Sequence, residues 1–385
     1  MQVWFVRGAE AVRQWLFESR FGYFIVFCVA FTIFRNGAWA IPNLPIQLLI
    51  AKQPFHNPFL KAPDVQYLLY SPFAHYIAHL VGVYRSEALF LSFHFLIWVV
   101  GFAAVLFFAR RVHGDRSARW IGLAFTLLPI STAVVGWLGF ADVYTFLLGT
   151  LIAASTTGWV NGVAAVAMGF NHFEQGLVGI AALSAFQLLF GIRSRKAVAV
   201  QLSGVLLGRA LVSAWFGLFD VRPNAGRLSW AVGHGMVHLF VSNVSHLQAF
   251  VYSTFALLWP VIILIGFYLW RQHGWKGALV GGLFLCLMAV GLAGGDPSRD
   301  YALIAWPLLV GVLLFILSRI GEGDARLLDW LLTGGVAAAV VVPPVMVWQG
   351  VYSSALMFDL YYAVDAIAGT HLVKGTPEYL VMPFR

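Results

Sequence analysis

Long apolar runs recur along the chain from Phe21 to Gly350, and short charged clusters separate them. A helix that crosses a hydrocarbon core of roughly 30 Å needs about 20 mostly apolar residues. The pattern therefore predicts about eleven transmembrane helices, some of them short. Their approximate limits are residues 21–35, 88–109, 120–137, 143–158, 161–171, 176–191, 197–217, 248–270, 277–294, 301–318 and 327–350. The fifth run is marginal, and a broken or re-entrant hairpin with the sixth is an alternative to a separate span.

The same pattern predicts a single membrane domain over residues 1–385. No polar linker between the runs is long enough to separate soluble modules, and the chain shows no fixed repeat. Its composition agrees, because 61% of the residues are hydrophobic and 10% are charged, against roughly 25% charged residues in an ordinary soluble domain. The expected fold class is an all-α polytopic transmembrane bundle.

Positive charge predicts how the bundle is oriented. Basic residues gather at the N-terminus and in alternate loops, at 110–119, 193–196, 271–276 and 319–326. Short loops rich in Lys and Arg stay in the cytoplasm. We therefore expect a cytoplasmic N-terminus and an outer C-terminal tail, residues 351–385, in a bacterial inner membrane. The net charge of +8 forms no extended basic face, which argues against nucleic acid as a partner.

The first outer segment, residues 36–87, contains an apolar piece from Tyr67 to Val83 that could be counted as another span. Counting it would invert every later loop. Pro72, His75 and His79 interrupt the piece, so we interpret it as an interfacial or re-entrant helix. Residues 41–51 and 65–83 are then expected as two amphipathic helices on the outer face, and the C-terminal tail as a short surface helix over the site.

The two cysteines, Cys28 and Cys286, both fall inside apolar runs. That placement supports neither a disulfide framework nor a thiolate metal site. We expect both to be buried packing residues.

Outside the basic clusters, ionisable residues gather in a few outer turns and loops. The carboxylates among them are Asp64, Asp142, Glu174, Asp220, Asp296 and Asp300, and the basic residues are His172, Arg222, Arg227, His234, His238, His246 and Arg299. Short turns between packed helices have no structural need for so many charges, so we expect these residues to converge on one site. The alternative is helix capping, since Asp142 and Asp296 both occupy N-cap positions of predicted helices.

Arg209 lies within the seventh apolar run, nearer its outer end. An intramembrane Arg is costly and usually faces a protein cavity, where a phosphate or carboxylate can meet it. With Arg222, Arg227 and Arg299 it would form an anion clamp, because guanidinium groups match phosphate oxygens in bidentate geometry. The alternative is a side chain that extends to the interface or bonds buried carbonyls.

His234 and His238 have the i, i+4 spacing of two ligands on one helix face, but Gly235 stands where a zinc protease motif requires Glu. We therefore assign no metal, and expect both histidines to hydrogen-bond to a substrate or to the interface. His172 and Glu174 would orient the acceptor or hold a divalent cation if one is used. The chain contains no P-loop and no G-x-G-x-x-G, so nucleotide binding is unsupported.

The layout resembles the GT-C superfamily of integral membrane glycosyltransferases that use polyprenyl-phosphate sugars. The match rests on a basic inner N-terminus, a first span and a long outer segment in which an Asp precedes an aromatic-Pro stretch, here Asp64 with Tyr67 and Tyr70-Ser71-Pro72-Phe73. Further spans with charged outer turns follow. The chain departs from the superfamily directly after the first span, where many members carry an acidic residue and this chain has Arg35-Asn36.

The resemblance implies transfer of a sugar from a polyprenyl-phosphate donor to a cell-envelope lipid or glycan acceptor on the outer face, with inversion. Asp64 would act as the base, with Asp142 as the alternative. The residues expected to bind the donor phosphate or substrate are Arg209, Arg222, Arg299, His172, Glu174, His234, His238 and Asp296. Membrane lipids are the expected surroundings.

Two other classes of protein stay open. A polysaccharide polymerase or ligase of the O-antigen type uses paired Arg residues in large outer loops, and Arg222 with Arg227 fits that description. A flippase or transporter of lipid-linked glycans also uses intramembrane Arg and broken helices, but the chain shows no matching halves.

Overall fold

The computed structural model describes residues 2–36, 44–221, 223, 236–342, 344–347 and 351–353, with the backbone alone at 2–6, 63–64, 236 and 351–353. In this part of the chain, 17 α-helices and one two-stranded hairpin are present. The prediction of an all-α fold is confirmed for the bundle. The hairpin is an addition that no sequence pattern indicated.

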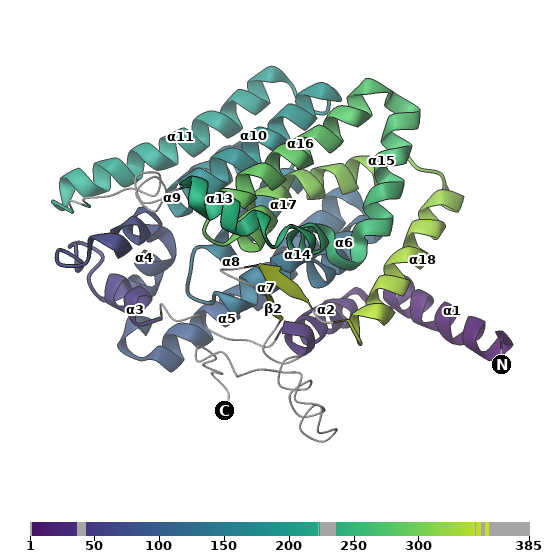
Figure 1. Ribbon diagram of the computed structural model, residues 1–385, viewed down its shortest axis with the longest axis horizontal. Coiled ribbons are helices and arrows are strands. Elements are labelled where there is room, and N and C mark those ends of the chain that lie inside the picture. Colours follow the sequence, from purple (N-terminus) through teal and green to yellow (C-terminus); the bar gives the residue numbers. More distant parts are fainter. Residues whose placement is uncertain are drawn as a thin grey trace.

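The first half of the bundle begins with an arm and a group of short helices. In order these are α1 (Gln2–Glu18), α2 (Phe21–Asn36), α3 (Leu44–Lys52), the 3₁₀ helix η1 (Pro63–Tyr70), α4 (Pro72–Val81) and η2 (Val83–Arg85). Helices of the bundle follow, namely α5 (Glu87–His113), α6 (Asp115–Leu127), α7 (Pro129–Gly136), α8 (Asp142–Ala154) and α9 (Gly158–Asn171). In Figure 1, α3 and α4 lie at one side of the molecule and α1 extends from the other.

The second half supplies most of the long helices. They are α10 (Phe173–Leu189), α11 (Arg195–Leu218), α13 (Met236–Val244), α14 (Leu247–Phe255), η3 (Ala256–Leu258), α15 (Trp259–His273), α16 (Trp275–Leu292), α17 (Pro297–Leu317) and α18 (Glu322–Ala339). The strands β1 (Val345–Val347) and β2 (Val351–Ser353) pair in antiparallel register after α18. Helix α17 is the centre of the bundle, because nearly all of its apolar stretch is buried by its neighbours (Figure 1).

Five helices in the described residues are long and apolar enough to cross a membrane. They are Glu87–His113, Arg195–Leu218, Leu247–His273, Trp275–Leu292 and Pro297–Leu317. Two bent pairs, α1 with α2 and α6 with α7, raise the number to seven if each pair is one span. The chain is therefore a multi-pass helical protein with five to seven candidate membrane spans.

Eleven full spans are not confirmed. The runs at 143–158 and 176–191 fold as the shorter helices α8 and α10. Helix α8 ends early because the Ser155 hydroxyl accepts a hydrogen bond from the Thr157 backbone amide at 3.1 Å, which offers the chain a turn in place of another helical residue. The run at 327–350 ends as a helix at Ala339 and continues as strand β1.

The segment around Tyr67 does not form a span. It folds as η1 and α4, and the ten residues of α4 cover only about 15 Å at 1.5 Å per residue. Helix α3 overlaps the other predicted amphipathic piece. The predicted helix in the C-terminal tail falls outside the described residues, apart from strand β2.

The basic clusters meet at one end of the bundle, which we call the basic end. Arg116 forms an ion pair with Asp329 at 2.6 Å, and Arg119 donates to the Leu16 carbonyl at 2.7 Å. Arg193 donates to the Thr156 carbonyl at 3.1 Å. These contacts gather loops that the charge pattern assigned to one side of the membrane.

The two cysteines differ in environment. Cys28 is buried in α2, as expected, but Cys286 is exposed on α16. The expectation of burial is wrong for Cys286 because α16 packs through another of its faces, where Gly277, Val280 and Phe284 are buried.

Candidate functional site

Three predicted outer turns meet at the end of the bundle opposite the basic end. The Asn171 side-chain amide donates to the Ala141 carbonyl and to the Thr145 hydroxyl, both at 2.9 Å. The Gln175 amide donates to Asp300 Oδ1 at 2.7 Å. The turn at 171–175 therefore ties the turn at 138–142 to the turn at 294–300. We call this end of the bundle the carboxylate end.

Arg299 lies between two carboxylates at the carboxylate end. Its Nε donates to Asp142 Oδ2 at 2.7 Å and its Nη2 to Asp142 Oδ1 at 3.0 Å. Its Nη1 donates to Asp296 Oδ2 at 2.7 Å. The Asp142 side chain is fully buried and the Arg299 side chain is 12% exposed, so this bidentate pair is held away from water. The three residues form the Arg299 cluster.

Aromatic rings enclose the guanidinium of Arg299. Its Cζ lies 5.1 Å from the centre of the Trp137 ring and 5.6 Å from that of Phe140. Both rings belong to a small apolar cluster that also contains Leu68 from η1 and Met346 from β1. The Arg299 cluster is thus covered by η1 and by the unpredicted hairpin.

The capping interpretation of the two aspartates is not supported by the geometry. Ala141 occupies the N-cap position of α8, and Asp142 is the first helical residue. Asp296 does occupy the N-cap position of α17, but its side chain makes no capping hydrogen bond. Both carboxylates are directed to Arg299 instead.

Arg209 lies on α11 beside the turn at 171–175. Its Cζ stands 4.3 Å from the centre of the Tyr70 ring and 5.5 Å from that of Phe173. Its Nη1 atom is buried and has no hydrogen-bond partner among the described residues. Because Phe173 lies between Asn171 and Gln175, Arg209 adjoins the turn that joins the other two outer turns.

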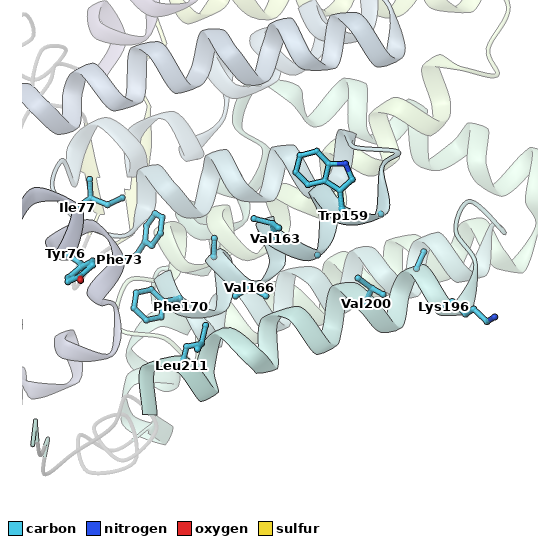
Figure 2. A pocket seen from close by; sticks show the side chains of 14 residues that line it. Phe73, Tyr76, Ile77, Trp159, Val163, Val166, Phe170, Lys196, Val200 and Leu211 are labelled. Atoms are coloured by element: carbon cyan, nitrogen blue, oxygen red, sulfur yellow. The ribbon is translucent and has the colours of Figure 1, made fainter. Parts of the chain in front are cut away.

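An apolar groove of about 980 Å³ runs along α9 and α11. Figure 2 shows it extending from Trp159 and Lys196 to Phe73, Tyr76 and Phe170. Lys196 is the single charged residue in its lining among the described residues. At its aromatic end the groove comes close to Arg209, because the preceding residue, Gly208, packs against Phe170, which lines the groove. A Cβ atom at Gly208 would lie 2.5 Å from the Phe170 backbone nitrogen.

The predicted site residues therefore divide into groups. Asp142, Asp296 and Arg299 come together, and Arg209 lies beside the turn that contains the half-buried Glu174 and the buried His172. The backbone of Asp64 lies in η1, but its side chain falls outside the described part, as do Arg222, Arg227 and His234. His238 is exposed on α13 and takes no part in the buried cluster.

Sequence reasoning assigned no role to several polar residues that the structure buries. Asn36 accepts a hydrogen bond from the Thr132 hydroxyl at 2.6 Å, and Arg35 donates to the Thr126 carbonyl at 2.8 Å. These bonds hold the end of α2 to α6 and α7. Asn171 and Gln175 were visible only as members of a polar turn. A buried amide that joins two turns cannot be recognised before its partners are known.

No group of three or more His, Cys, Asp or Glu residues suited to a metal occurs in the described part of the chain. Comparisons with known protein families, curated proteins and solved structures found no match. The fold and the site alone define the class, which is a multi-pass helical protein with a buried charged cluster at one end and a lateral apolar groove leading towards it.

Proposed function

We propose that the chain is an integral membrane glycosyltransferase of the GT-C type, which moves a sugar from a polyprenyl-phosphate donor to a cell-envelope lipid or glycan. The observation that carries the proposal is the apolar groove whose aromatic end adjoins Arg209. A lipid donor matches this arrangement, because its long apolar tail would fill the groove and the phosphate at the end of the tail would lie beside the arginine. The membrane is a bacterial inner membrane, with the basic end in the cytoplasm.

The groove suits the donor's hydrocarbon tail. Its lining is almost wholly apolar, and it is formed by residues of α4, α9 and α11 (Figure 2). The 14 residues of α9 span about 21 Å at 1.5 Å per residue, which is more than half of a hydrocarbon core of roughly 30 Å. Tail burial would be driven by packing against the aromatic and β-branched side chains along this length.

Arg209 suits the donor's phosphate. The Tyr70 and Phe173 rings fix the plane of the guanidinium, and Nη1 has no protein partner in the described residues. A phosphate oxygen would supply that partner in a charge-assisted hydrogen bond. The leaving phosphate gains negative charge during transfer, so this contact would strengthen in the transition state.

Asp64 is the base in this proposal. Asp142, the alternative, has both of its carboxylate oxygens bonded to Arg299, which stabilises the charged carboxylate and weakens it as a proton acceptor. Asp64 precedes Leu68 and Leu69 in η1, and these two residues pack in the apolar cluster with Trp137. The helix that carries Asp64 is therefore beside the Arg299 cluster.

The reaction proceeds by inversion. Asp64 takes the proton of the acceptor hydroxyl as that oxygen attacks the anomeric carbon. The bond between the anomeric carbon and the phosphate oxygen breaks, and the polyprenyl phosphate leaves with the bonding electron pair. The Arg299 cluster acts as a positioning element, while His172 and Glu174 orient the acceptor. Arg222, His234 and His238 remain predicted phosphate ligands.

The test is transfer of radiolabelled sugar from polyprenyl-phosphate donors by the purified protein in lipid vesicles. Asp64→Asn should lower kcat by roughly 10²- to 10⁴-fold, as expected for a lost general base. Arg209→Gln should raise KM for the donor by roughly 10- to 100-fold, as expected for a lost charge-assisted hydrogen bond. Glu87→Gln, which removes an exposed carboxylate in the same outer segment, is the matched control.

Two outcomes contradict the proposal. Normal transfer by Asp64→Asn removes the base assignment. Absence of transfer with every donor, combined with movement of a fluorescent lipid-linked glycan across the vesicle membrane that Arg209→Gln abolishes, identifies a transporter instead.

A further inference from the structure

A second cavity, of about 450 Å³, lies at the basic end of the bundle. It is formed where α5, α8, α10 and α17 end, and its polar lining comprises His113, Ser155, Thr156, Gln187, Arg193, Ser318 and Arg319. Arg299 and Arg319 are separated by the length of α17, which is roughly 30 Å at 1.5 Å per residue. The cavity is therefore separate from the Arg299 cluster and from the proposed transfer site.

The cavity gathers positive charge without a counter-charge. Its lining contains Arg193, Arg319 and His113 and no Asp or Glu. Neither arginine forms an ion pair within the part of the chain that the structure describes. Arg193 is half-buried and Arg319 is exposed, so both cations line an accessible cavity, where an anion would offset their positive charge.

Uncharged partners hold the basic side chains in place. The Arg193 guanidinium donates from Nη1 to the Thr156 carbonyl at 3.1 Å, and His113 Nε2 donates to the Ala154 carbonyl at 2.7 Å. The Arg319 guanidinium stacks with its Cζ 4.1 Å from the centre of the Phe315 ring. These contacts orient the groups and leave further N–H donors unused.

Gln187 provides an independent observation in the same cavity. Its side chain lines the cavity and the residue is only 2% exposed. Its Oε1 atom has no hydrogen-bond partner among the described residues. Buried amides are normally satisfied, so a polar ligand in the cavity would complete this group.

We propose that this cavity binds a phosphate-bearing anion at the basic end of the protein. Arg193 and Arg319 contact the anionic oxygens, and Gln187 accepts a hydrogen bond from a hydroxyl of the ligand. The shared chemistry fits two sources, the head group of an anionic phospholipid in the adjoining leaflet and free inorganic phosphate. The inference does not depend on the glycosyltransferase proposal.

Native mass spectrometry of the full chain in detergent tests the inference. The probes are dioleoyl phosphatidylglycerol, dioleoyl phosphatidylcholine and inorganic phosphate. Arg193→Gln/Arg319→Gln should weaken binding of phosphatidylglycerol, of phosphate or of both by at least about tenfold, since each lost charge-assisted hydrogen bond is worth that factor. Arg195→Gln/Arg271→Gln, which removes two exposed arginines outside the cavity, should change binding less than about twofold.

The arms of the experiment distinguish the two sources. Phosphatidylglycerol binding that exceeds phosphatidylcholine binding and needs the cavity arginines supports a lipid head group. Phosphate binding with the same dependence supports the free ion. The inference is overturned if Arg193→Gln/Arg319→Gln and Arg195→Gln/Arg271→Gln bind the probes equally. It is also overturned if the wild type binds neither phosphatidylglycerol nor inorganic phosphate. Arg193→Lys/Arg319→Lys, which keeps the charge, should retain more binding than the Gln variant and guards against loss through misfolding.

Discussion

Arg299 organises the carboxylate end through its hydrogen bonds to Asp142 and Asp296. Taking these charges out of water is costly, and the cost is offset only while good hydrogen-bond geometry is kept. The bidentate contact to Asp142, at 2.7 and 3.0 Å, meets that condition. Removing one partner therefore costs more than the pair contributes, because the other charge stays buried.

Arg299→Gln should lower the free energy of unfolding by roughly 3–5 kcal/mol, because it leaves the fully buried Asp142 carboxylate without its cation. Thermal unfolding in detergent would measure the loss. Arg110→Gln is the control, since the Arg110–Asp115 pair is well exposed and such pairs contribute about 1 kcal/mol or less. Equal losses in the two variants would show that Asp142 is not held as described.

His75 in α4 gives a prediction about pH. Burial lowers its pKa to about 4, against the weaker opposing effect of a hydrogen bond to the Ser71 carbonyl. In the unfolded chain, His75 has an ordinary pKa near 6.5. Between pH 6.5 and pH 4 it is therefore protonated in the unfolded chain and neutral in the folded chain. Stability is unaffected above pH 6.5, falls as the pH drops through this window, and has lost up to about 3 kcal/mol at its lower limit.

His75→Gln removes this titration while keeping a polar group beside Gln47. The drop in melting temperature between pH 6.5 and pH 4 should therefore be smaller in the variant than in the wild type. The melting temperatures of the wild type and the variant above pH 7, where His75 is neutral in both the folded and the unfolded chain, supply the baseline. An unchanged drop would mean that His75 is protonated in the folded protein.

At the scale of elements, α9 and α11 approach closely and form one wall of the apolar groove. A Cβ atom at Gly208 would lie 2.2 Å from the Val166 carbonyl oxygen, and one at Gly169 would lie 2.0 Å from that of Val205. Small residues at such crossings let two helix backbones touch, which is how helices associate in a membrane. The groove and the position of Arg209 both depend on this contact.

Gly208→Ala should therefore destabilise the protein by roughly 1–3 kcal/mol, the usual cost of overpacking, and should weaken donor binding by moving Arg209. Gly217→Ala is the same substitution on the same helix, where a Cβ meets nothing within 4 Å. It should be neutral or slightly stabilising, because Ala favours the helix over Gly. Melting curves and donor titrations of the two variants measure both effects. Equal stability and equal donor binding of the two variants would contradict the close contact between α9 and α11.

At the scale of the whole molecule, the bundle has two chemically different ends joined by α17. One end carries the basic loops, and the other carries the Arg299 cluster. Short basic loops remain in the cytoplasm, so the basic end should face the cytoplasm and the carboxylate end should face outward.

Accessibility labelling in intact cells tests this orientation. In a Cys28→Ser/Cys286→Ser background, Lys52→Cys and Glu87→Cys at exposed positions of the first outer segment should react with an impermeant maleimide. Arg195→Cys and Glu322→Cys, exposed at the basic end, should react only after the cells are opened. Reaction of all four positions from one side would reject the two-ended arrangement.

Several features of the fold could be predicted from local sequence. Helices occur in every predicted apolar run, because a segment's hydropathy depends on its own residues. The basic loops gather at one end for a similar reason, since alternation along the chain sorts successive loops between two sides. The number of full spans could not be read in this way, because Ser155 and its neighbours end helices through hydrogen bonds that hydropathy does not measure.

The amino-acid sequence by itself determined that the chain is helical, apolar and polarised in charge, since these properties are sums over neighbouring residues. Only the tertiary structure decided that Asp142 and Asp296 hold Arg299 and do not cap helices, and that a β-hairpin covers them. Asp142 and Arg299 are 157 residues apart, and the groove is built from three separate helices. Such partners are selected by helix packing, which brings distant residues within hydrogen-bonding distance and leaves no trace in the spacing of either residue along the chain.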